Sequence, residues 1–235
     1  MQGKSKILLT LFVLASVLLL GGRQPVFAVE ADHPGINLAN PIYHGDPGSR
    51  NIALTVNVFW GEEYLPAMLE TMSRHKVRAT FFIGGAWAEK FPELVLKIQE
   101  AGHEIGSHGY AHPHPDRIGK EGNLRDINKA GEILYRITGH TPQLYAPPYG
   151  ERGPEVLEAA RECGYTTILW SVDTIDWQRP GADVITQRVM KRAAGGAIIL
   201  MHPTAPTGEA LPHIITGLQK KGYQFVTVSE LLAEN

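Results

Sequence analysis

The sequence lacks several features that mark common protein classes. It contains a single cysteine, Cys163, which excludes an intrachain disulfide and a cysteine-based metal cluster. It lacks an excess of positive charge, because the formal net charge is −2, and this excludes a broad basic surface for nucleic acid. No G-x-G-x-x-G follows the first predicted strand, so a dinucleotide-binding fold loses its main support.

The N-terminus lacks an apolar run of membrane-spanning length. Lys4 and Lys6 precede fourteen mostly apolar residues, 7–20, and V-F-A at 26–28 forms a small-residue cleavage pattern. We predict a secretory signal peptide over 1–28, cleaved after Ala28. An uncleaved membrane anchor is the alternative, but the run is shorter than the roughly 17 to 25 residues of a full span. Either way the folded part is expected outside the cytoplasm, secreted or anchored to the membrane.

The remainder divides into a short connecting segment and one domain. Residues 29–50 are rich in Pro, Gly, Asn and Asp without an apolar period, which indicates a linker or extended arm. From 51 to 235, short β-branched or aromatic runs alternate with amphipathic segments. Predicted strands cover 51–58, 79–83, 104–107, 143–146, 166–170, 197–201 and 224–227; predicted helices cover 63–76, 92–101, 122–138, 154–163, 182–194 and 208–221. This alternation predicts parallel strands in a closed or nearly closed β/α barrel, with chemistry at the C-terminal strand ends.

Two histidines follow the third predicted strand, in S-H-G-Y-A-H-P-H-P-D. On one helical turn, the spacing of four would project His108 and His112 from the same face, where they can hold one divalent metal, with zinc expected. Two exposed polar residues in a loop would give the same spacing. The position at a predicted strand end favours the metal.

Further polar and rigid residues follow the later strands. The run Y-A-P-P-Y-G, 145–150, either aims a backbone N–H into a cleft or is an ordinary rigid turn. The fifth strand is followed by Asp173, Asp176 and Trp177, and the sixth ends at His202. A carboxylate that binds one imidazole nitrogen would make His202 a general acid, whereas a lone histidine is more often a satisfied core residue.

Taken together, S-H-G-Y-A-H, A-P-P-Y-G, D-T-I-D-W and L-M-H, with A-T-F-F-I-G-G at 79–85 and A-G-H-E-I-G-S-H at 101–108, resemble the polysaccharide deacetylase family, the NodB-homology domain of carbohydrate esterase family 4. The resemblance covers about 51–232. It implies a distorted seven- or eight-stranded β/α barrel that removes acetyl groups from chitin, peptidoglycan or xylan. It also implies a divalent metal held by one Asp and two His. The variant T-x-N-V-x-W-G, 55–61, resembles a sporulation-associated branch.

The resemblance also implies roles for individual residues. His108 and His112 would be metal ligands, His202 the general acid and Asp176 the partner that tunes it. The backbone N–H of Tyr149 would stabilise the oxyanion. Substrate would be bound by Trp177 and Leu200, which line the pocket for the acetyl methyl, and by Pro148.

The first and third motifs depart from the family pattern. Where the family has T-F-D-D-G, this chain has Asn57 at the general-base position and Val58 at the metal-ligand position, and Ala146 replaces the supporting Arg. An amide has no useful basicity, and valine coordinates nothing. Metal occupancy should therefore be weak or absent. We expect Asn57 to cap the strand end by hydrogen bonding.

Three functions follow as alternatives. The first is an exported protein that binds or acts on acetylated cell-wall glycan, peptidoglycan or chitin-like, with ordinary deacetylase activity weakened or lost. The second is an active metal-dependent deacetylase in which Glu62, Glu63 or Asp173 supplies the missing carboxylate, although acids at a helix start are also favoured by the helix dipole. The third is a scaffold with a structural metal site that binds a protein through Trp60 and Tyr64. A monomer is expected, with no nucleic-acid partner.

Overall fold

The computed structural model describes residues 40–234, and all structural statements below concern that part of the chain. The strands are β1 (Asn51–Val58), β2 (Thr80–Ile83), β3 (Glu104–Ser107), β4 (Leu144–Tyr145), β5 (Thr166–Thr167), β6 (Val172–Asp173), β7 (Ile198–Met201) and β8 (Gln224–Val226). The helices are α1 (Leu65–Arg74), α2 (Gly85–Lys90), α3 (Pro92–Glu100), α4 (Gly119–Thr138), α5 (Pro154–Glu162), α6 (Ala182–Arg192), α7 (Ala205–Lys220) and α8 (Val228–Leu232). Short 3₁₀ turns are η1 (Pro115–Arg117), η2 (Pro148–Gly150) and η3 (Asp176–Gln178).

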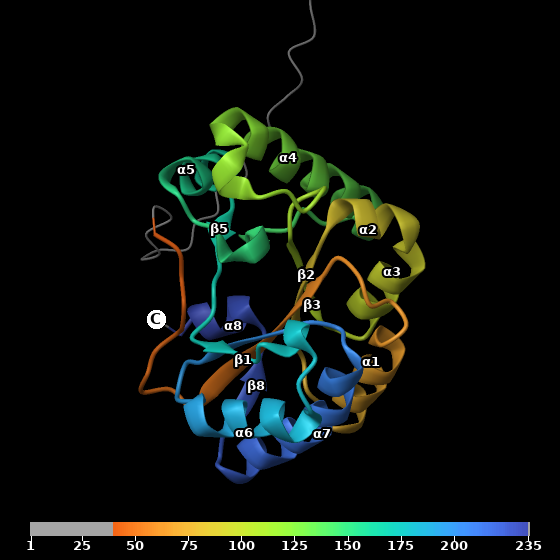
Figure 1. Cartoon of the computed structure of the whole chain (residues 1–235), viewed down its shortest axis with the longest axis vertical. Helices are drawn as coiled ribbons and strands as arrows, with labels where there is room; N and C mark the ends of the chain where they lie inside the picture. The colour runs from red at the N-terminus through yellow and green to blue at the C-terminus, as the bar shows by residue number, and fades with distance from the viewer. Residues whose placement is uncertain (1–39, 235) are drawn as a thin grey trace, which may run out of the picture.

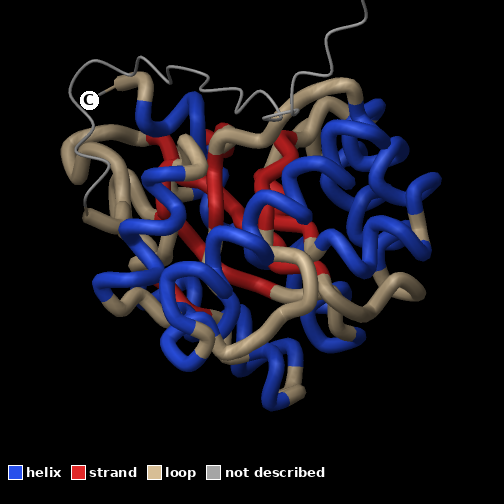
Figure 2. The backbone as a smooth tube through the Cα atoms, turned by 90° about the horizontal axis from the view of Figure 1, so that it is seen from above, coloured by secondary structure: helices blue, strands red, loops and turns tan. Residues whose placement is uncertain are grey.

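The strands form one parallel, curled sheet. The strand order is β5-β4-β3-β2-β1-β7-β6, and β8 pairs with the first residues of β1. Helices surround this sheet, as the central strands and outer helices of Figures 1 and 2 show. The β5 and β6 edges do not pair with each other, so the barrel is distorted and incompletely closed by strands. This confirms the predicted barrel class.

Alternate residues of β1 face two different cores. Leu54 and Val56 belong to the apolar cluster between the sheet and the helices. Ala53 belongs with Phe82 to a second cluster inside the curled sheet. Because side chains alternate along a strand, Asn57 shares the inner face with Ala53, near the C-terminal mouth of the barrel. The base position of the first motif is thus inside the barrel mouth.

The described part of the segment before β1, residues 40–50, is bound to the sheet, and we call it the N-terminal arm. The Ile42 N–H donates to the carbonyl oxygen of Thr167, the last residue of β5, at 2.9 Å. The Gly45 N–H donates to the carbonyl oxygen of Gly196 at 2.8 Å, just before β7. The arm therefore contacts segments on both sides of the gap that the strands leave open.

Arm docking depends on a glycine, and this gives a stability prediction. Gly196 has φ +71, and a Cβ there would lie 2.5 Å from Asp46 O and 2.7 Å from Gly45 C. We expect Gly196→Ala to destabilise the fold by about 2 to 4 kcal/mol, from backbone strain plus overpacking. Gly222→Ala is the matched control, because Gly222 also has positive φ, +84, but its Cβ would meet nothing within 4 Å. Urea unfolding that gave equal losses for both variants would contradict the arm contact.

The expected elements lie where they were predicted, with differences at short segments. The predicted strand 166–170 is β5 of only two residues, and the separate β6 was missed. The helices α2 and α8 were also missed, because six and five residues are too few to display a helical period. The first predicted helix begins at Leu65 rather than at residue 63, and the last long one begins at Ala205 rather than at 208.

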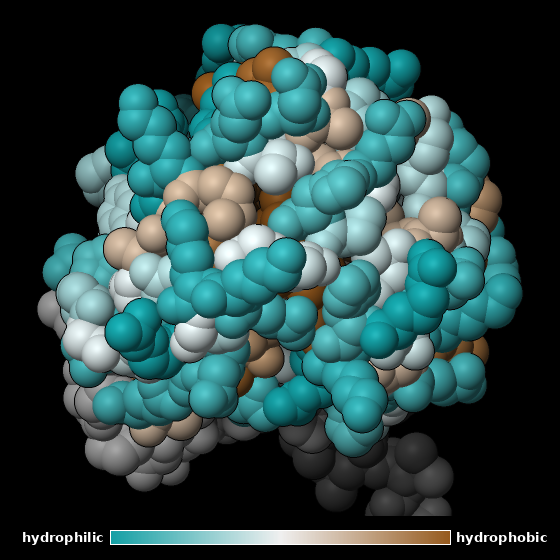
Figure 3. All heavy atoms as spheres, turned by 90° about the horizontal axis from the view of Figure 1, so that it is seen from below, coloured by the Kyte–Doolittle hydropathy of each residue, from teal (hydrophilic) through white to brown (hydrophobic). Residues whose placement is uncertain are grey.

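The predicted signal peptide, 1–28, lies outside the described residues. Within 40–234, no helix combines the length and apolar character needed to cross a bilayer. The face shown in Figure 3 is mainly hydrophilic, with apolar areas small and separated.

Candidate functional site

The histidine pair of the second motif lies at the C-terminal end of β3. The His108 N–H donates to the Ile83 carbonyl oxygen at 3.0 Å, which continues the ladder beyond the strand. The His108 and His112 rings lie with centroids 5.0 Å apart. The His108 Nδ1–H donates to the Ala146 carbonyl oxygen at 2.6 Å. This bond leaves Nε2 as the nitrogen with a free lone pair, as in metal-binding histidines.

Both imidazoles are held neutral. Burial, and to a lesser extent the nearby His112, lower the pKa of His108 to about 3. Burial also lowers the pKa of His112. Neutral imidazole is the form that binds a metal, so these two side chains are prepared as ligands.

The first motif contributes no charged group beside this pair. Asn57 is 5% exposed, and its Oδ1 is buried without a hydrogen-bond partner. The expectation that Asn57 caps the strand end through this oxygen is therefore wrong. Val58 is fully buried in the apolar cluster between the sheet and the helices. A buried polar atom without a hydrogen-bond partner costs about 1 to 3 kcal/mol. Asn57 Oδ1 is therefore an exception to the rule that buried polar groups are paired.

The donor set does not fit a complete catalytic metal site. Within 40–234, no three His, Cys, Asp or Glu side chains form a group able to hold a metal. Glu62 instead faces the Trp87 indole N–H at 3.5 Å, and Asp173 accepts the Ile175 N–H at 2.8 Å. Two imidazoles are one donor short of the three protein ligands of a typical catalytic zinc. The substitute carboxylates proposed from the sequence are not brought to the histidine pair.

The opposite side of the mouth carries a complete hydrogen-bonded network around Asp176. Its carboxylate is fully buried and accepts the His202 N–H at 2.6 Å and the His202 Nδ1–H at 2.8 Å. The Thr207 hydroxyl donates to the same carboxylate at 2.6 Å. Thr207 is in turn placed by Thr204, the N-cap of α7, whose hydroxyl oxygen accepts the Thr207 N–H at 3.1 Å. The expected pairing of Asp176 with His202 is therefore present in the structure.

This network gives a second stability prediction. Asp176→Asn keeps the size but turns an NH₂ group toward donors, so we expect a loss of about 3 kcal/mol in unfolding free energy. Asp173→Asn is the control on the same loop, because an amide oxygen can still accept the Ile175 N–H. We expect it to cost less than about 0.5 kcal/mol. Equal losses in chemical unfolding would show that the carboxylate network is not specifically stabilising.

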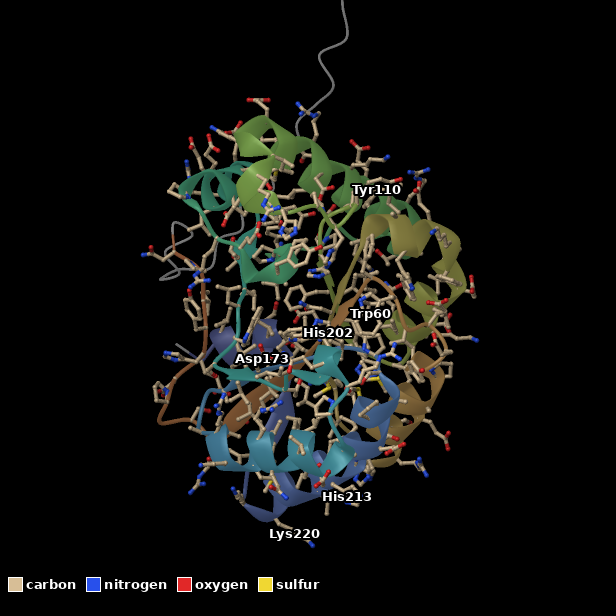
Figure 4. All side chains as sticks on the ribbon, in the orientation of Figure 1. Trp60, Tyr110, Asp173, His202, His213 and Lys220 are labelled. Atoms are coloured by element: carbon tan, nitrogen blue, oxygen red, sulfur yellow. The ribbon has the colours of Figure 1, made fainter. Side chains whose placement is uncertain are left out.

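Aromatic rings flank the two histidine groups. The rings of Phe59 and His112 have centroids 4.8 Å apart. Trp60 stacks almost parallel on His202, at 5.8 Å and 7°, and Figure 4 shows these two side chains beside each other. Trp60 remains 37% exposed. Consecutive residues after β1 therefore place apolar ring surface against imidazoles on both sides of the mouth.

The remaining predicted site residues lie within or after strands of the barrel along the sequence, and their exposure to solvent differs. Pro148 and Leu200 are buried, whereas Tyr149 and Trp177 are 58% and 55% exposed. Within the described chain, no hydrogen-bond acceptor engages the Tyr149 N–H, while the Gly150 N–H donates to Pro147 O. The oxyanion and acetyl-pocket roles stay predictions.

Backbone strain gathers at the strand ends. His112, Tyr149 and Ile175 have φ of 54°, 59° and 51°, three of the five non-glycine positive values in 40–234. Such φ values are uncommon, and they are outliers for a β-branched residue such as isoleucine. They persist where surrounding contacts impose them, typically at functional sites. The loops that carry the predicted site residues are thus held in a constrained form.

Four residues that touch the site were not singled out from the sequence for the contacts they make. Phe59 is half of an aromatic pair after β1, and His114 continues the H-P-H-P run, so both carried a weak signal. Glu151 hydrogen-bonds His114, and Thr207 hydrogen-bonds Asp176 across 31 residues. No local pattern indicates those two pairings.

Comparison with known proteins agrees with this geometry. A family model described as Polysaccharide deacetylase matches residues 44–168. A peptidoglycan-N-acetylglucosamine deacetylase of Bacillus cereus is 38% identical over 195 residues, covering 80% of this chain and 70% of that protein. An uncharacterised Bacillus subtilis protein, YlxY, is 42% identical over 194 residues, covering 83% of this chain and 61% of its own length.

Solved structures show the same relation. The crystal structure of a CE4 family pseudoenzyme from Bacillus anthracis matches with a TM-score of 0.80 and 40% identity, over 82% of this chain and 69% of that chain. The family match spans more than half of this sequence, and the Bacillus cereus relative is covered over more than two thirds of its length. With the barrel, the histidine pair and the Asp176–His202 network, these matches show that the chain belongs to the polysaccharide deacetylase family.

Proposed function

We propose that this chain is an exported cell-wall protein that binds acetylated glycan on a deacetylase barrel, with ordinary hydrolysis weakened or lost. The observation that carries the proposal is the end of β1. Asn57, without basicity, and Val58, without a donor atom, stand where the family has its general base and its metal carboxylate. The incomplete donor set of the histidine pair supports the same conclusion.

The glycan class is supported by relatives and by ring surfaces. Curated relatives are named peptidoglycan-N-acetylglucosamine and peptidoglycan-N-acetylmuramic acid deacetylases. Exposed Trp60, Tyr149 and Trp177 offer aromatic faces at the strand ends, and amphipathic rings of this kind suit ligands with apolar faces and polar edges. The sequence pattern of residues 1–28 supports export to where such a glycan lies.

The neighbouring pseudoenzyme supports the loss of hydrolysis. It is named a pseudoenzyme in its wild-type form, and a mutant of it is described as having restored enzymatic activity. A barrel of this kind can therefore stay folded without turnover in that protein. The divergent first motif gives this chain a physical reason for the same outcome.

A second candidate function keeps hydrolysis. Its support is the retained His108 tautomer and the complete Asp176–His202 network, which a pure binding protein has no chemical need to keep. When bound, a divalent metal, with zinc expected, would supply Lewis-acid activation of the acetyl carbonyl. His108 and His112 would hold it, and His202 would carry the proton for the leaving amine.

One experiment separates the two. The purified chain is incubated with zinc, cobalt or chelator, and metal content and acetate release from peptidoglycan and chitin oligomers are measured. Binding to acetylated and de-N-acetylated glycan is measured in parallel. We expect binding to the acetylated form, weak metal retention and no acetate. Acetate release that disappears in His108→Ala would establish the second candidate, and binding to neither glycan would refute the first.

A further inference from the structure

Tyr149 is an exposed aromatic ring on an unfavourable backbone. It is 58% exposed, and its φ of 59° is a left-handed value that costs a non-glycine residue about 1 to 2 kcal/mol. It lies in η2, directly after β4, at the mouth of the barrel. A large ring held toward solvent at an energetic cost requires an explanation.

The ring is fixed on one side by histidines. His114 stacks on Tyr149 with centroids 4.0 Å apart and an interplanar angle of 10°. His112 meets it nearly perpendicularly, at 4.8 Å and 72°. A parallel stack covers one face of the phenol ring. At 58% exposure, more than half of the Tyr149 residue surface still faces solvent.

His114 is itself fixed by Glu151. Its Nδ1 lies 2.7 Å from Glu151 Oε1, while Glu151 Oε2 accepts the Asp116 N–H at 2.9 Å. Asp116 Oδ1 then accepts the Gly153 N–H at 2.8 Å. These reciprocal bonds join the loop after β3 to the loop after β4. The Tyr149 ring is therefore clamped before any ligand arrives, which lowers the entropy cost of binding.

We propose that Tyr149 is a platform on which a pyranose ring of the glycan stacks, and that His114 is a positioning residue for it through the ring stack. The proposal rests on the proposed glycan-binding function. A sugar ring presents C–H groups on one face and hydroxyls at its edge, and the phenol offers an apolar face and a polar tip. The platform adjoins His112, so a sugar stacked there lies beside the histidine pair.

The simpler alternative is that His114 and Glu151 only join two loops. Substitutions at His114 separate the two functions. His114→Phe keeps an aromatic ring against Tyr149 but loses the bond to Glu151, whereas His114→Asn keeps a donor for Glu151 but loses the stack. A platform needs the stack, and a loop tie needs the bond.

The test uses tetra-N-acetylchitotetraose as probe, with dissociation constants from calorimetry and Tm from thermal unfolding. We expect Tyr149→Ala to weaken binding at least tenfold and Tyr149→Phe to stay within threefold of the unmodified chain. We expect His114→Asn to weaken binding about fivefold, and His114→Phe to retain it. Tyr135→Ala, which removes an equally exposed ring, 56%, from α4, should change nothing.

The outcomes are distinguishable. Unchanged binding in Tyr149→Ala, while the unmodified chain binds the tetramer, overturns the platform and leaves the proposed function standing. Absence of binding to both the tetramer and peptidoglycan by the unmodified chain overturns both proposals. Binding that is kept by His114→Asn and lost by His114→Phe shows a loop tie and overturns the positioning role. If Tyr149→Ala lowers Tm, Tyr149→Leu takes its place in the comparison.

Discussion

Replacing Asn57 and Val58 together by aspartate is expected to raise zinc affinity about 100-fold over the unmodified chain. Structural zinc sites with four ligands bind with about 10 to 16 kcal/mol, which is roughly 3 kcal/mol, or about a factor of 100, for each ligand. The double variant puts one carboxylate on the inner face of the barrel mouth, at position 57, and another at position 58, where the family pattern has its metal carboxylate. One of the two is expected to join the two neutral imidazoles of His108 and His112. The variant also places a basic group at position 57, so acetate release from chitin oligomers should appear together with metal.

The same variant should become metal-dependent in stability. Val58 is fully buried in an apolar cluster, so a carboxylate there without metal is an unpaired buried charge that costs several kcal/mol. Zinc that binds only the folded state then restores stability by mass action. We expect a lower Tm than that of the unmodified chain in chelator, and a large rise on adding zinc. This readout does not depend on turnover.

Two controls identify the source of the effect. Val56→Asp places the same charge on the same face of β1, in the same apolar cluster but two residues before the strand end. It should destabilise the fold without rescue by zinc. Removing His108 from the double variant should abolish the zinc response. A double variant with no gain in zinc affinity would show that positions 57 and 58 are not what limits the site.

Acid is expected to destabilise the protein steeply between pH 6.5 and about 4.5. Burial, and then the charge of Arg78, lower the pKa of His103 to about 4, and burial with His112 lowers that of His108 to about 3. In the unfolded chain both titrate near 6.5. Below that pH the two histidines bind protons in the unfolded state but stay neutral in the folded state, so the free energy of unfolding falls as pH falls. Each histidine contributes up to about 1.4 kcal/mol per pH unit, for a combined loss of about 4 kcal/mol across this window.

The window separates histidines from carboxylates. Glu151 and Glu230 keep pKa values below their usual 4.5, because hydrogen bonds from His114, and from the Thr227 N–H and Arg78, outweigh the effect of burial. Their contributions are lost only at lower pH. Urea unfolding as a function of pH measures the slope.

Substitution of one histidine tests the assignment. His103→Asn should reduce the slope by roughly a third to a half, because His103 is one of three histidines whose pKa burial lowers. An amide oxygen can still accept the Ala79 N–H that His103 Nδ1 accepts at 3.1 Å, so the variant keeps that hydrogen bond. Exposed His140→Asn should leave it unchanged. An unchanged slope of stability against pH in His103→Asn would contradict the assignment of this pH dependence to buried histidines.

The barrel could be predicted from the sequence because the patterns that indicate its strands and helices are periodic and lie within short segments. Strand β1 and the motif histidines follow from short patterns, and β1 begins and ends where expected. Strands of two residues, such as β5 and β6, have no period of their own and exist through their partners. The docking of the N-terminal arm was equally invisible, since Pro and Gly also suit a free linker.

At the site, the identities of the residues could be predicted from the sequence, but their hydrogen-bond and stacking partners could not. That Asn57 lacks basicity is evident from the sequence, whereas the missing partner of its Oδ1 depends on everything around it. The Asp176–His202 pair followed from motif order. The third donor, Thr207, and the stack of His114 on Tyr149 join loops that only the folded sheet brings together.

The N-terminal arm has a consequence for the order of assembly during synthesis. Its partners at Thr167 and Gly196 leave the ribosome long after the arm does. At about 5 to 20 residues per second, the interval of roughly 125 to 150 residues lasts between about 6 and 30 seconds. Such distant contacts form late in folding because the intervening loop must first close. The first described residues to be made are thus among the last to be placed, and until then the β5 edge is exposed to pairing with other chains.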